Sequence, residues 1–279
     1  MTRFTLSVLN AAGETTASAT GQGEVWLVYG PEYAPGDRLR LDCSDPDQFI
    51  VLQLDDALPP AYVYCKGSGC DYPVPYGEAR KIFSSRAFAG TQHYLHVRLA
   101  TPAEISQRRD LALNPWATHE PGGPLPFAFA NVETRGEMVF AAKNAIDGLK
   151  ANDSHGAWPY TSWGIDRDPK AAWRLDFGRA VELDEAVFYL RADFPHDAWW
   201  REATLHFSDG SRLTVPLEKT GTGQRFPFSP RQVEWVTLDT LIKADDPSPF
   251  PALTQLGLWG RETAETLARF GPVPSRTIY

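Results

Sequence analysis

The sequence predicts an all-β protein made of two antiparallel β-sandwiches of the jelly-roll type. Three observations lead to this prediction. Short runs of β-branched and aromatic residues recur along the 279 residues, turn-forming residues separate them, and long stretches of helical periodicity are scarce. The hydrophobic content of 43% is that of a globular protein with a sizeable core.

The first sandwich is expected over residues 1–100. Turn signals such as PGD at 35–37 and SDPD at 44–47 separate its strands, which are expected at 3–9, 24–30, 38–44, 49–56, 61–65 and 94–100. Its aromatic and acidic residues show no evident clustering. This half is therefore expected to be a structural or second binding module, with the interface between the sandwiches as a second cleft. The residues in question are Trp26, Tyr29, Tyr33, Asp55 and Asp56.

Residues 101–129 are expected to connect the two sandwiches. The run TPAEISQRRDLAL, 101–113, predicts a helix, because Thr101 can cap it with Glu104 three residues on and Pro102 fits the first turn. The density of Pro and Gly in the following segment excludes regular structure and indicates a connector.

The second sandwich is assigned to residues 130–262, with strands at 171–177, 185–192, 203–208, 212–217, 224–228, 233–242 and 253–260. FGRAVELD, SDGS and SPRQ are expected to be tight connections at one end. Every second connection in an antiparallel order leaves from the same end. The longer loops at about 149–171, 191–202, 217–224 and 243–252 are therefore expected to share one rim.

The tail, 263–279, predicts one or two helical turns before Gly271.

Composition and charge exclude several classes of function. The net charge of −8 repels phosphate backbones, so nucleic acid is not an expected partner. No run of 18 apolar residues and no export signal is visible, which predicts a soluble, cytoplasmic protein without a membrane span. The three cysteines are interpreted as reduced structural thiols. No nucleophile elbow, P-loop or dinucleotide fingerprint is present.

The rim loops carry the residues that indicate a binding site. A sugar ring stacks a C–H face on an aromatic ring, and its neighbouring hydroxyls match a guanidinium or a carboxylate. Phe250 in the last loop is expected to stack or to pack. The candidate ligand-binding residues are His155, Trp158, Tyr160, Trp163, Arg191, Asp193, His196, Asp197, Trp199, Trp200, Asp245 and Asp246.

Each cluster also has a structural interpretation. About half of the five rim aromatics are expected to close the end of the core, and because Trp199 and Trp200 are adjacent only one of them can face a ligand. Arg191 and Asp193 either grip sugar hydroxyls or form a salt bridge that braces the loop. An Arg191 that pairs with an acid would suit a uronate or a sialate.

Two other functions stay open at this stage. Asp193, His196 and Asp197 offer acid and base groups for a glycan-active enzyme, with a partner carboxylate from Asp153, Asp166, Asp245 or Asp246. A metal site from His155 and His196 is a further alternative, although no HExxH spacing supports it. The rim aromatics could instead be hot spots for a partner protein.

Three short motifs resemble a known family. KNAIDG at 143–148, WRLDFG at 173–178 and QLGLWG at 255–260 resemble the galactose-binding-like β-sandwich of discoidin and coagulation-factor type C domains, over roughly 130–262. The loop sequences are similar to a bacterial subgroup described as carbohydrate-binding proteins. The resemblance implies non-catalytic binding of a mono- or oligosaccharide. It does not specify the sugar or the oligomeric state.

The same resemblance implies a structural calcium ion near the KNAIDG motif. Asp147 matches the motif aspartate, Asn144 and Asn152 lie near it, and Gln255 stands where the family has a glutamate. Calcium takes six to eight oxygen ligands, and the change to glutamine removes one formal charge. The alternative is that Asp147 and Gly148 simply form a turn.

Overall fold

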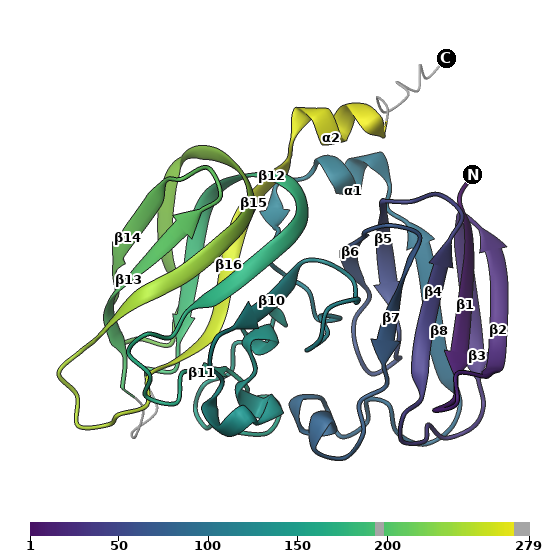
Figure 1. Cartoon of the computed structure of the whole chain (residues 1–279), viewed down its shortest axis with the longest axis horizontal. Coiled ribbons are helices and arrows are strands. Elements are labelled where there is room, and N and C mark those ends of the chain that lie inside the picture. The colour runs from purple at the N-terminus through teal and green to yellow at the C-terminus, as the bar shows by residue number, and fades with distance from the viewer. Residues whose placement is uncertain (193–197, 271–279) are drawn as a thin grey trace.

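The computed structural model describes residues 1–192 and 198–270, and the described residues form three antiparallel sheets with short helices between them (Figure 1). This confirms the predicted all-β, antiparallel architecture. Two separate groups of sheets are visible in the view, one coloured purple to blue and the other green to yellow.

The N-terminal residues form two four-stranded sheets that face each other. One sheet has the order β2-β1-β4-β7 and the other β3-β8-β5-β6. Alternate side chains of both sheets, such as Leu6, Leu41, Leu52 and Val97, meet in one fully buried core. The strands are β1 (Arg3–Leu9), β2 (Thr15–Gln22), β3 (Glu24–Tyr29), β4 (Arg38–Cys43), β5 (Gln48–Gln53), β6 (Ala61–Cys65), β7 (Gly69–Pro73) and β8 (His93–Leu99).

The predicted helix from Thr101 is shorter in the structure. Its cap is as expected, since the Thr101 hydroxyl accepts from the Glu104 backbone N–H and the Glu104 carboxylate accepts from the Thr101 N–H, but the helix ends at Ser106. The following residues pair with the last strand instead: the Leu111 N–H donates to the Leu258 carbonyl. Backbone pairing with a core strand therefore overrides the helical pattern after Ser106.

Short elements cover the space between the sheets. They are η1 (Gly77–Ile82), α1 (Pro102–Ser106), β9 (Arg109–Asp110), β10 (Phe127–Ala130), η2 (Thr134–Gly136), η3 (Met138–Phe140) and η4 (Ala142–Ile146). The elements that follow along the chain are β11 (Trp163–Gly164), the strands β12 (Trp173–Leu190), β13 (Trp200–Phe207), β14 (Arg212–Pro216), β15 (Gln224–Lys243) and β16 (Ala252–Glu262) of the C-terminal sheet, and α2 (Ala264–Arg269).

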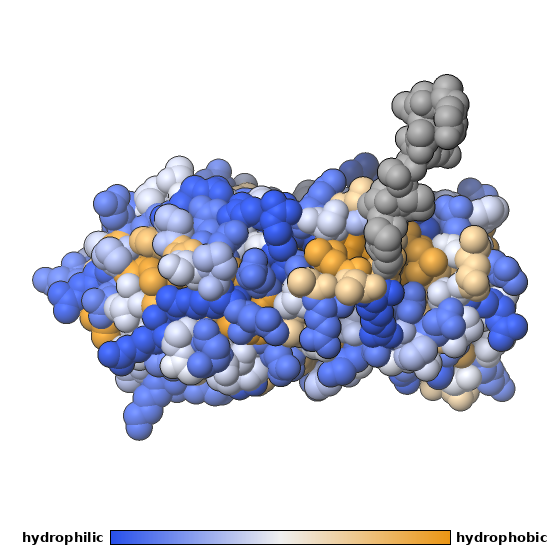
Figure 2. All heavy atoms as spheres, turned by 90° about the horizontal axis from the view of Figure 1, so that it is seen from above, coloured by the Kyte–Doolittle hydropathy of each residue, from blue (hydrophilic) through white to orange (hydrophobic). Residues whose placement is uncertain are grey.

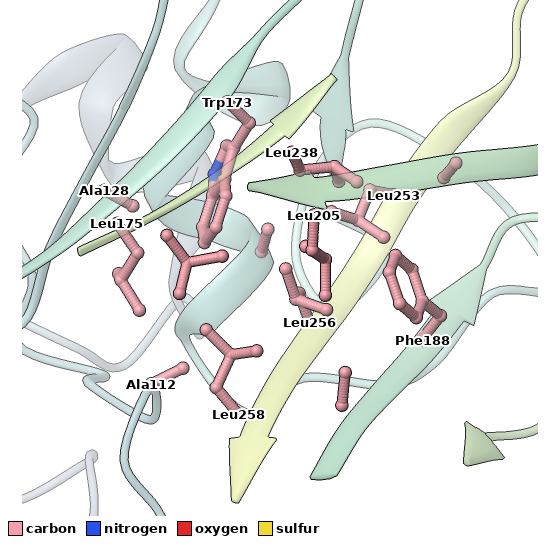
Figure 3. Close-up of a cluster of buried hydrophobic side chains, with 14 of the residues drawn as sticks. Ala112, Ala128, Trp173, Leu175, Phe188, Leu205, Leu238, Leu253, Leu256 and Leu258 are labelled. Atoms are coloured by element: carbon pink, nitrogen blue, oxygen red, sulfur yellow. The ribbon is translucent and has the colours of Figure 1, made fainter. Parts of the chain in front are cut away.

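The C-terminal strands belong to one eight-stranded sheet, in which β11-β16-β12-β15-β13-β14 are neighbours while β10 pairs with β12 and β9 with β16. The prediction that FGRAVELD, 177–184, and SPRQ, 229–232, are tight connections is wrong. They lie inside the long strands β12 and β15, where the pairing register shifts between Asp176 and Val181. The buried side chains of β12, β13, β15 and β16 form the core shown in Figure 3, with Trp173, Leu205 and Leu256 fully buried.

The predicted rim loops lie close together in the structure. Arg191 Nη2 donates to the Ser154 carbonyl at 3.1 Å, which joins the first loop to the second. The Ala244 N–H donates to the Trp199 carbonyl at 2.9 Å, and Lys219 Nζ lies 2.6 Å from Asp246 Oδ2, so the third and fourth loops are adjacent as well.

The two groups of sheets meet through a buried ion network. Glu262, whose side chain is fully buried, accepts from the guanidinium groups of Arg109 and Arg179. Arg179 in turn lies 4.9 Å from the ring centroids of Phe49 and Tyr64 in the N-terminal sheets. Charge pairing and aromatic stacking therefore act together at this contact.

The face of the molecule seen from above is mainly hydrophilic, with separate apolar patches (Figure 2). Among the described residues, no helix is both long and apolar enough to cross a bilayer.

Candidate functional site

A cavity of about 260 Å³ lies where three of the predicted rim loops meet, and we call it the rim cavity. It is smaller than the usual pocket for a drug-sized ligand and suits one small ring. The side chains that give it chemical character come from η2, from the loop after η4, from the residues after β11, from the residue after β12 and from the loop before β16. They are Arg135, His155, Asp166, Arg167, Arg191 and Phe250.

Three of these residues have a left-handed backbone. The φ angles are 55° at Arg135, 47° at Asp166 and 64° at Arg167. This region is uncommon for residues other than glycine, and such strain clusters at functional sites. All three residues line the rim cavity.

Phe250 gives the cavity an exposed aromatic wall, with 46% of its surface accessible. The guanidinium carbon of Arg167 lies 5.4 Å from the centroid of its ring, within the range of a cation–π contact. Arg167 makes no ion pair with any described residue, and its charged group faces solvent at the cavity. The pair therefore offers an apolar face and a cation side by side.

Arg191 lines the rim cavity and is 98% buried, with 2% of its surface accessible. Its Nη1 donates to Ser162 Oγ at 3.0 Å and its Nη2 to the Ser154 carbonyl at 3.1 Å. These bonds join Arg191 to the first rim loop, while the predicted salt bridge with Asp193 involves a residue outside the described ranges. His155 lines the same cavity from an exposed position.

Two of the predicted stacking residues are core residues instead. Trp163 and Trp200 are 0% and 1% exposed, and their rings lie 6.3 Å apart inside the C-terminal core. Trp163 Nε1 donates to the Val132 carbonyl, so its polar edge is satisfied internally. The expectation that these rings face a ligand is corrected, because packing in the core leaves no face accessible. Trp199 is partly buried against the same core.

The other predicted residues lie apart from the rim cavity. Trp158 is exposed, but its backbone N–H donates to the Lys81 carbonyl, and it lines two other cavities together with residues of the N-terminal half. Tyr160 pairs with Asp153, which raises the pKa of its hydroxyl. Asp246 accepts from Lys219, which lowers its pKa, and Asp245 is exposed beside it. Asp193, His196 and Asp197 lie outside the described residues.

Sequence reasoning missed Arg135 and Arg167 as members of this cavity. Both stand in turn-like segments, TRG at 134–136 and IDRDP at 165–169, where an arginine looks like an ordinary solvated residue. The signal that reveals them is the left-handed backbone, which a sequence pattern does not display for residues other than glycine.

At the position where the calcium ion was expected, hydrogen bonds of the Gln255 side chain join the surrounding residues. The Gly148 N–H donates to Gln255 Oε1 at 2.9 Å, which fixes the orientation of the amide. Gln255 Nε2 then donates to the Asn144 carbonyl and to Asp147 Oδ1, the latter at 2.7 Å. An amide NH₂ group thus occupies the position between the oxygens that would ligate a cation.

The remaining oxygens do not make up a calcium site. Asn152 uses its Nδ2 to donate to the Leu190 carbonyl, and Asn144 retains one buried side-chain oxygen without a donor among the described residues. Calcium takes six to eight oxygens, mostly carboxylate or carbonyl. Asp147 is the one carboxylate here, and burial raises its pKa to about 7, which disfavours the anion. The residues present therefore do not fit calcium.

The N-terminal sheets hold an aromatic and acidic cluster that the sequence did not reveal. Tyr33 stacks on Tyr29 with ring centroids 5.3 Å apart and lies 4.1 Å from the ring of His93. His93 Nδ1 is 3.9 Å from Asp55 Oδ2. Both Asp55 oxygens accept backbone N–H groups, from Ala57 and Phe88, so this carboxylate fixes two loops.

Comparison with known proteins gives only remote likenesses. No family model matches the sequence, and no curated protein matches it. Among solved structures, chitosan-binding module 1 of a chitosanase/glucanase from Paenibacillus sp. IK-5 is similar at 16% identity and a TM-score of 0.39, covering 55% of this chain and 100% of that one.

Two further structures are similar to about half of the chain. The family 32 carbohydrate-binding module of Clostridium perfringens NanJ, solved with galactose, has 18% identity and a TM-score of 0.37, covering 47% of this chain and 91% of that one. A fucose-binding module from Streptococcus pneumoniae has 13% identity and a TM-score of 0.40, covering 55% and 98%.

Proposed function

We propose that the protein binds carbohydrate non-catalytically in the rim cavity and that it prefers sugars with a carboxylate. The observation that carries the proposal is the pairing of Arg167 with Phe250 at a cavity of about 260 Å³. The ring supplies an apolar surface for the C–H face of a sugar, and the guanidinium supplies a two-pronged donor for a carboxylate or a hydroxyl pair.

Charge supports an acidic ligand. Three arginines line the rim cavity, at 135, 167 and 191, against one acidic residue, Asp166. Arg135 is held by Glu137 through two hydrogen bonds and Arg191 by backbone and hydroxyl oxygens, so Arg167 is the cation best placed to contact a ligand. A uronate or a sialate matches this arrangement.

The number of carboxyl groups that line the rim cavity favours binding without hydrolysis. Hydrolysis of a glycosidic bond normally requires two carboxyl groups on opposite sides of the bond. The described residues place one such group, Asp166, in the rim cavity. Release of product from a glycan that binds would overturn the non-catalytic part of the proposal.

A thermal-shift screen tests the proposal. Glucuronate, galacturonate and N-acetylneuraminate are compared with the neutral methyl glucoside and methyl galactoside at equal ionic strength. We expect at least one acidic sugar to raise the melting temperature in proportion to the logarithm of its concentration. Phe250→Ala should remove this shift. The matched control is Trp26→Ala, which removes a ring that is 59% exposed on the N-terminal sheets and should leave the shift intact.

A further inference from the structure

A second and larger cavity, of about 470 Å³, lies between the N-terminal and C-terminal sheets, and we call it the interface cleft. Its walls come from both sides: the β5–β6 loop and η1 on one side, and η4 with the residues after it on the other. The side chains that define it are Tyr62, Phe83, Leu113, Lys143, Asp147 and Trp158. Cavities between domains are common ligand sites.

Lys143 is the unusual residue of the interface cleft. It is 96% buried, with 4% of its surface accessible, yet no described residue offers Nζ an acceptor within hydrogen-bonding distance. Its Nζ lies 5.3 Å from the centroid of the Phe83 ring, and the carboxyl groups of Asp147 and Glu133 act on its charge. Lys143 lines the interface cleft, and a buried ammonium group is costly unless it is hydrogen-bonded, so an acceptor on a ligand in the cleft would stabilise it.

Acceptors for a second hydrogen-bonding group lie across the same cleft. Asp147 Oδ2 accepts one bond, of 3.3 Å, from the Thr161 hydroxyl, and Asp110 uses Oδ1 for the N–H groups of Ala112 and Leu258. Both carboxylates line the cleft. A ligand carboxylate has no hydrogen to donate to these oxygens, and a ligand cation would meet Lys143. A neutral hydroxyl accepts from the lysine and donates to a carboxylate, so it satisfies both sides.

The apolar part of the interface cleft suits the face of a sugar ring or a cyclitol. Trp158 and Leu113 expose 42% and 41% of their surfaces at its edge. The backbone N–H of Trp158 donates to the Lys81 carbonyl at 2.7 Å, so the main chain that carries the ring is held before any ligand arrives. An aromatic ring that is already positioned loses little entropy on binding.

From this arrangement we infer that the interface cleft is a second binding site, for a neutral polyhydroxylated ring, with Lys143 and Asp147 gripping hydroxyls while Trp158 stacks. The inference is independent of the proposal for the rim cavity. It assigns the charged sugar and the neutral sugar to different cavities of one chain.

The test uses four neutral probes: methyl β-D-glucopyranoside, methyl β-D-galactopyranoside, methyl α-D-mannopyranoside and myo-inositol. Each is titrated into the full chain to about 20 mM while binding is followed by ligand-observed NMR. We expect saturable binding of at least one probe, weakened about tenfold or more by Lys143→Met. Leu113→Trp, which fills the cleft and retains the lysine, should abolish it, and Arg167→Gln should change it less than about twofold.

A second measurement keeps the inference testable if Lys143→Met fails to fold. Reductive methylation of Lys143, followed by mass spectrometry, should slow in the wild type when the bound probe is present, while methylation of the exposed Lys170 should not change. The inference is overturned if none of the four probes binds, if binding persists in Leu113→Trp, or if the bound probe leaves Lys143 methylation unchanged. Loss of acidic-sugar binding in Arg167→Gln with neutral binding retained would separate the two cavities.

Discussion

Gln255 donates its side-chain amide to Asp147 Oδ1 at 2.7 Å and to the backbone carbonyl of Asn144, so a neutral NH₂ group joins two oxygens that would otherwise need a cation between them. The same side chain accepts from the Gly148 N–H. All the hydrogen-bonding groups of this amide that face the loop are thus engaged. The loop after η4 is tied to the last strand, β16, without a metal.

Calcium should therefore have no effect on stability. We expect the melting temperature of the wild type to be the same in EDTA and in millimolar calcium. Gln255→Glu replaces the donor with a third acceptor beside Asp147, and without calcium it should lose about 2 kcal/mol or more of unfolding free energy. Differential scanning calorimetry measures both. A clear fall in the wild-type melting temperature on adding EDTA would mean that the amide assignment is wrong.

Asp147 should make stability depend on pH. Burial raises its pKa from 3.8 to about 7, so between these values the folded protein holds a proton that the unfolded chain has released. Stability contributed by this group is therefore complete at low pH and is lost as the pH rises toward 7.

Asp147→Asn isolates that effect, because the amide oxygen can still accept from Leu149 and Gln255. The unfolding free energy of the variant relative to the wild type should rise by about 1 kcal/mol or more between pH 4.5 and pH 7. Urea unfolding at several pH values measures it. The range stops at pH 7 because burial lowers the pKa of Lys143 to about 8. A difference that does not change with pH would contradict the burial of this carboxyl.

Glu262 should be important for holding the two groups of sheets together. It is fully buried between Arg109 and Arg179, so Glu262→Gln leaves two guanidinium groups without their carboxylate and should cost about 3 kcal/mol. The matched control is Asp42→Asn in the exposed pair with Arg40, whose side chains are 48% and 52% accessible, and it should cost less than about 1 kcal/mol. Equal losses in the two variants would refute a buried network.

Arg167 should show a trade-off between stability and binding. Its φ of 64° is strained for arginine and for alanine but not for glycine. Arg167→Gly should be about 1 kcal/mol more stable than Arg167→Ala, although neither variant should bind an acidic sugar. Chemical denaturation of the two variants compares them. If the alanine variant is the more stable one, the left-handed conformation at this position is incorrect.

The sequence was most informative about buried strands and least about polar ones. β16 and the second half of β12 read as nearly continuous apolar runs, and both were predicted. β2, with the sequence TTASATGQ, was missed because its side chains are exposed or partly exposed and it contains few of the large apolar residues that mark a strand. Its position at the edge of a sheet next to β1 is set by tertiary pairing.

The candidate site was predicted only in part for a related reason. Loop lengths indicated which connections share a rim, and His155 and Arg191 do line one cavity there. Residue type alone could not separate Trp163, whose ring is buried, from Trp158, whose ring is exposed, since both are tryptophans in one loop region. That distinction depends on which side chains the core can accommodate.

The most direct test of the central claim is an isothermal titration of the wild type and of Arg167→Gln with glucuronate and N-acetylneuraminate, at low and at physiological salt. We expect saturable 1:1 binding of an acidic sugar that weakens with salt. Its affinity should fall about tenfold or more in Arg167→Gln and stay unchanged in Arg212→Gln, a matched change at an exposed strand residue. Wild-type affinity for an acidic sugar that is the same in Arg167→Gln, or no binding of either sugar, would contradict it.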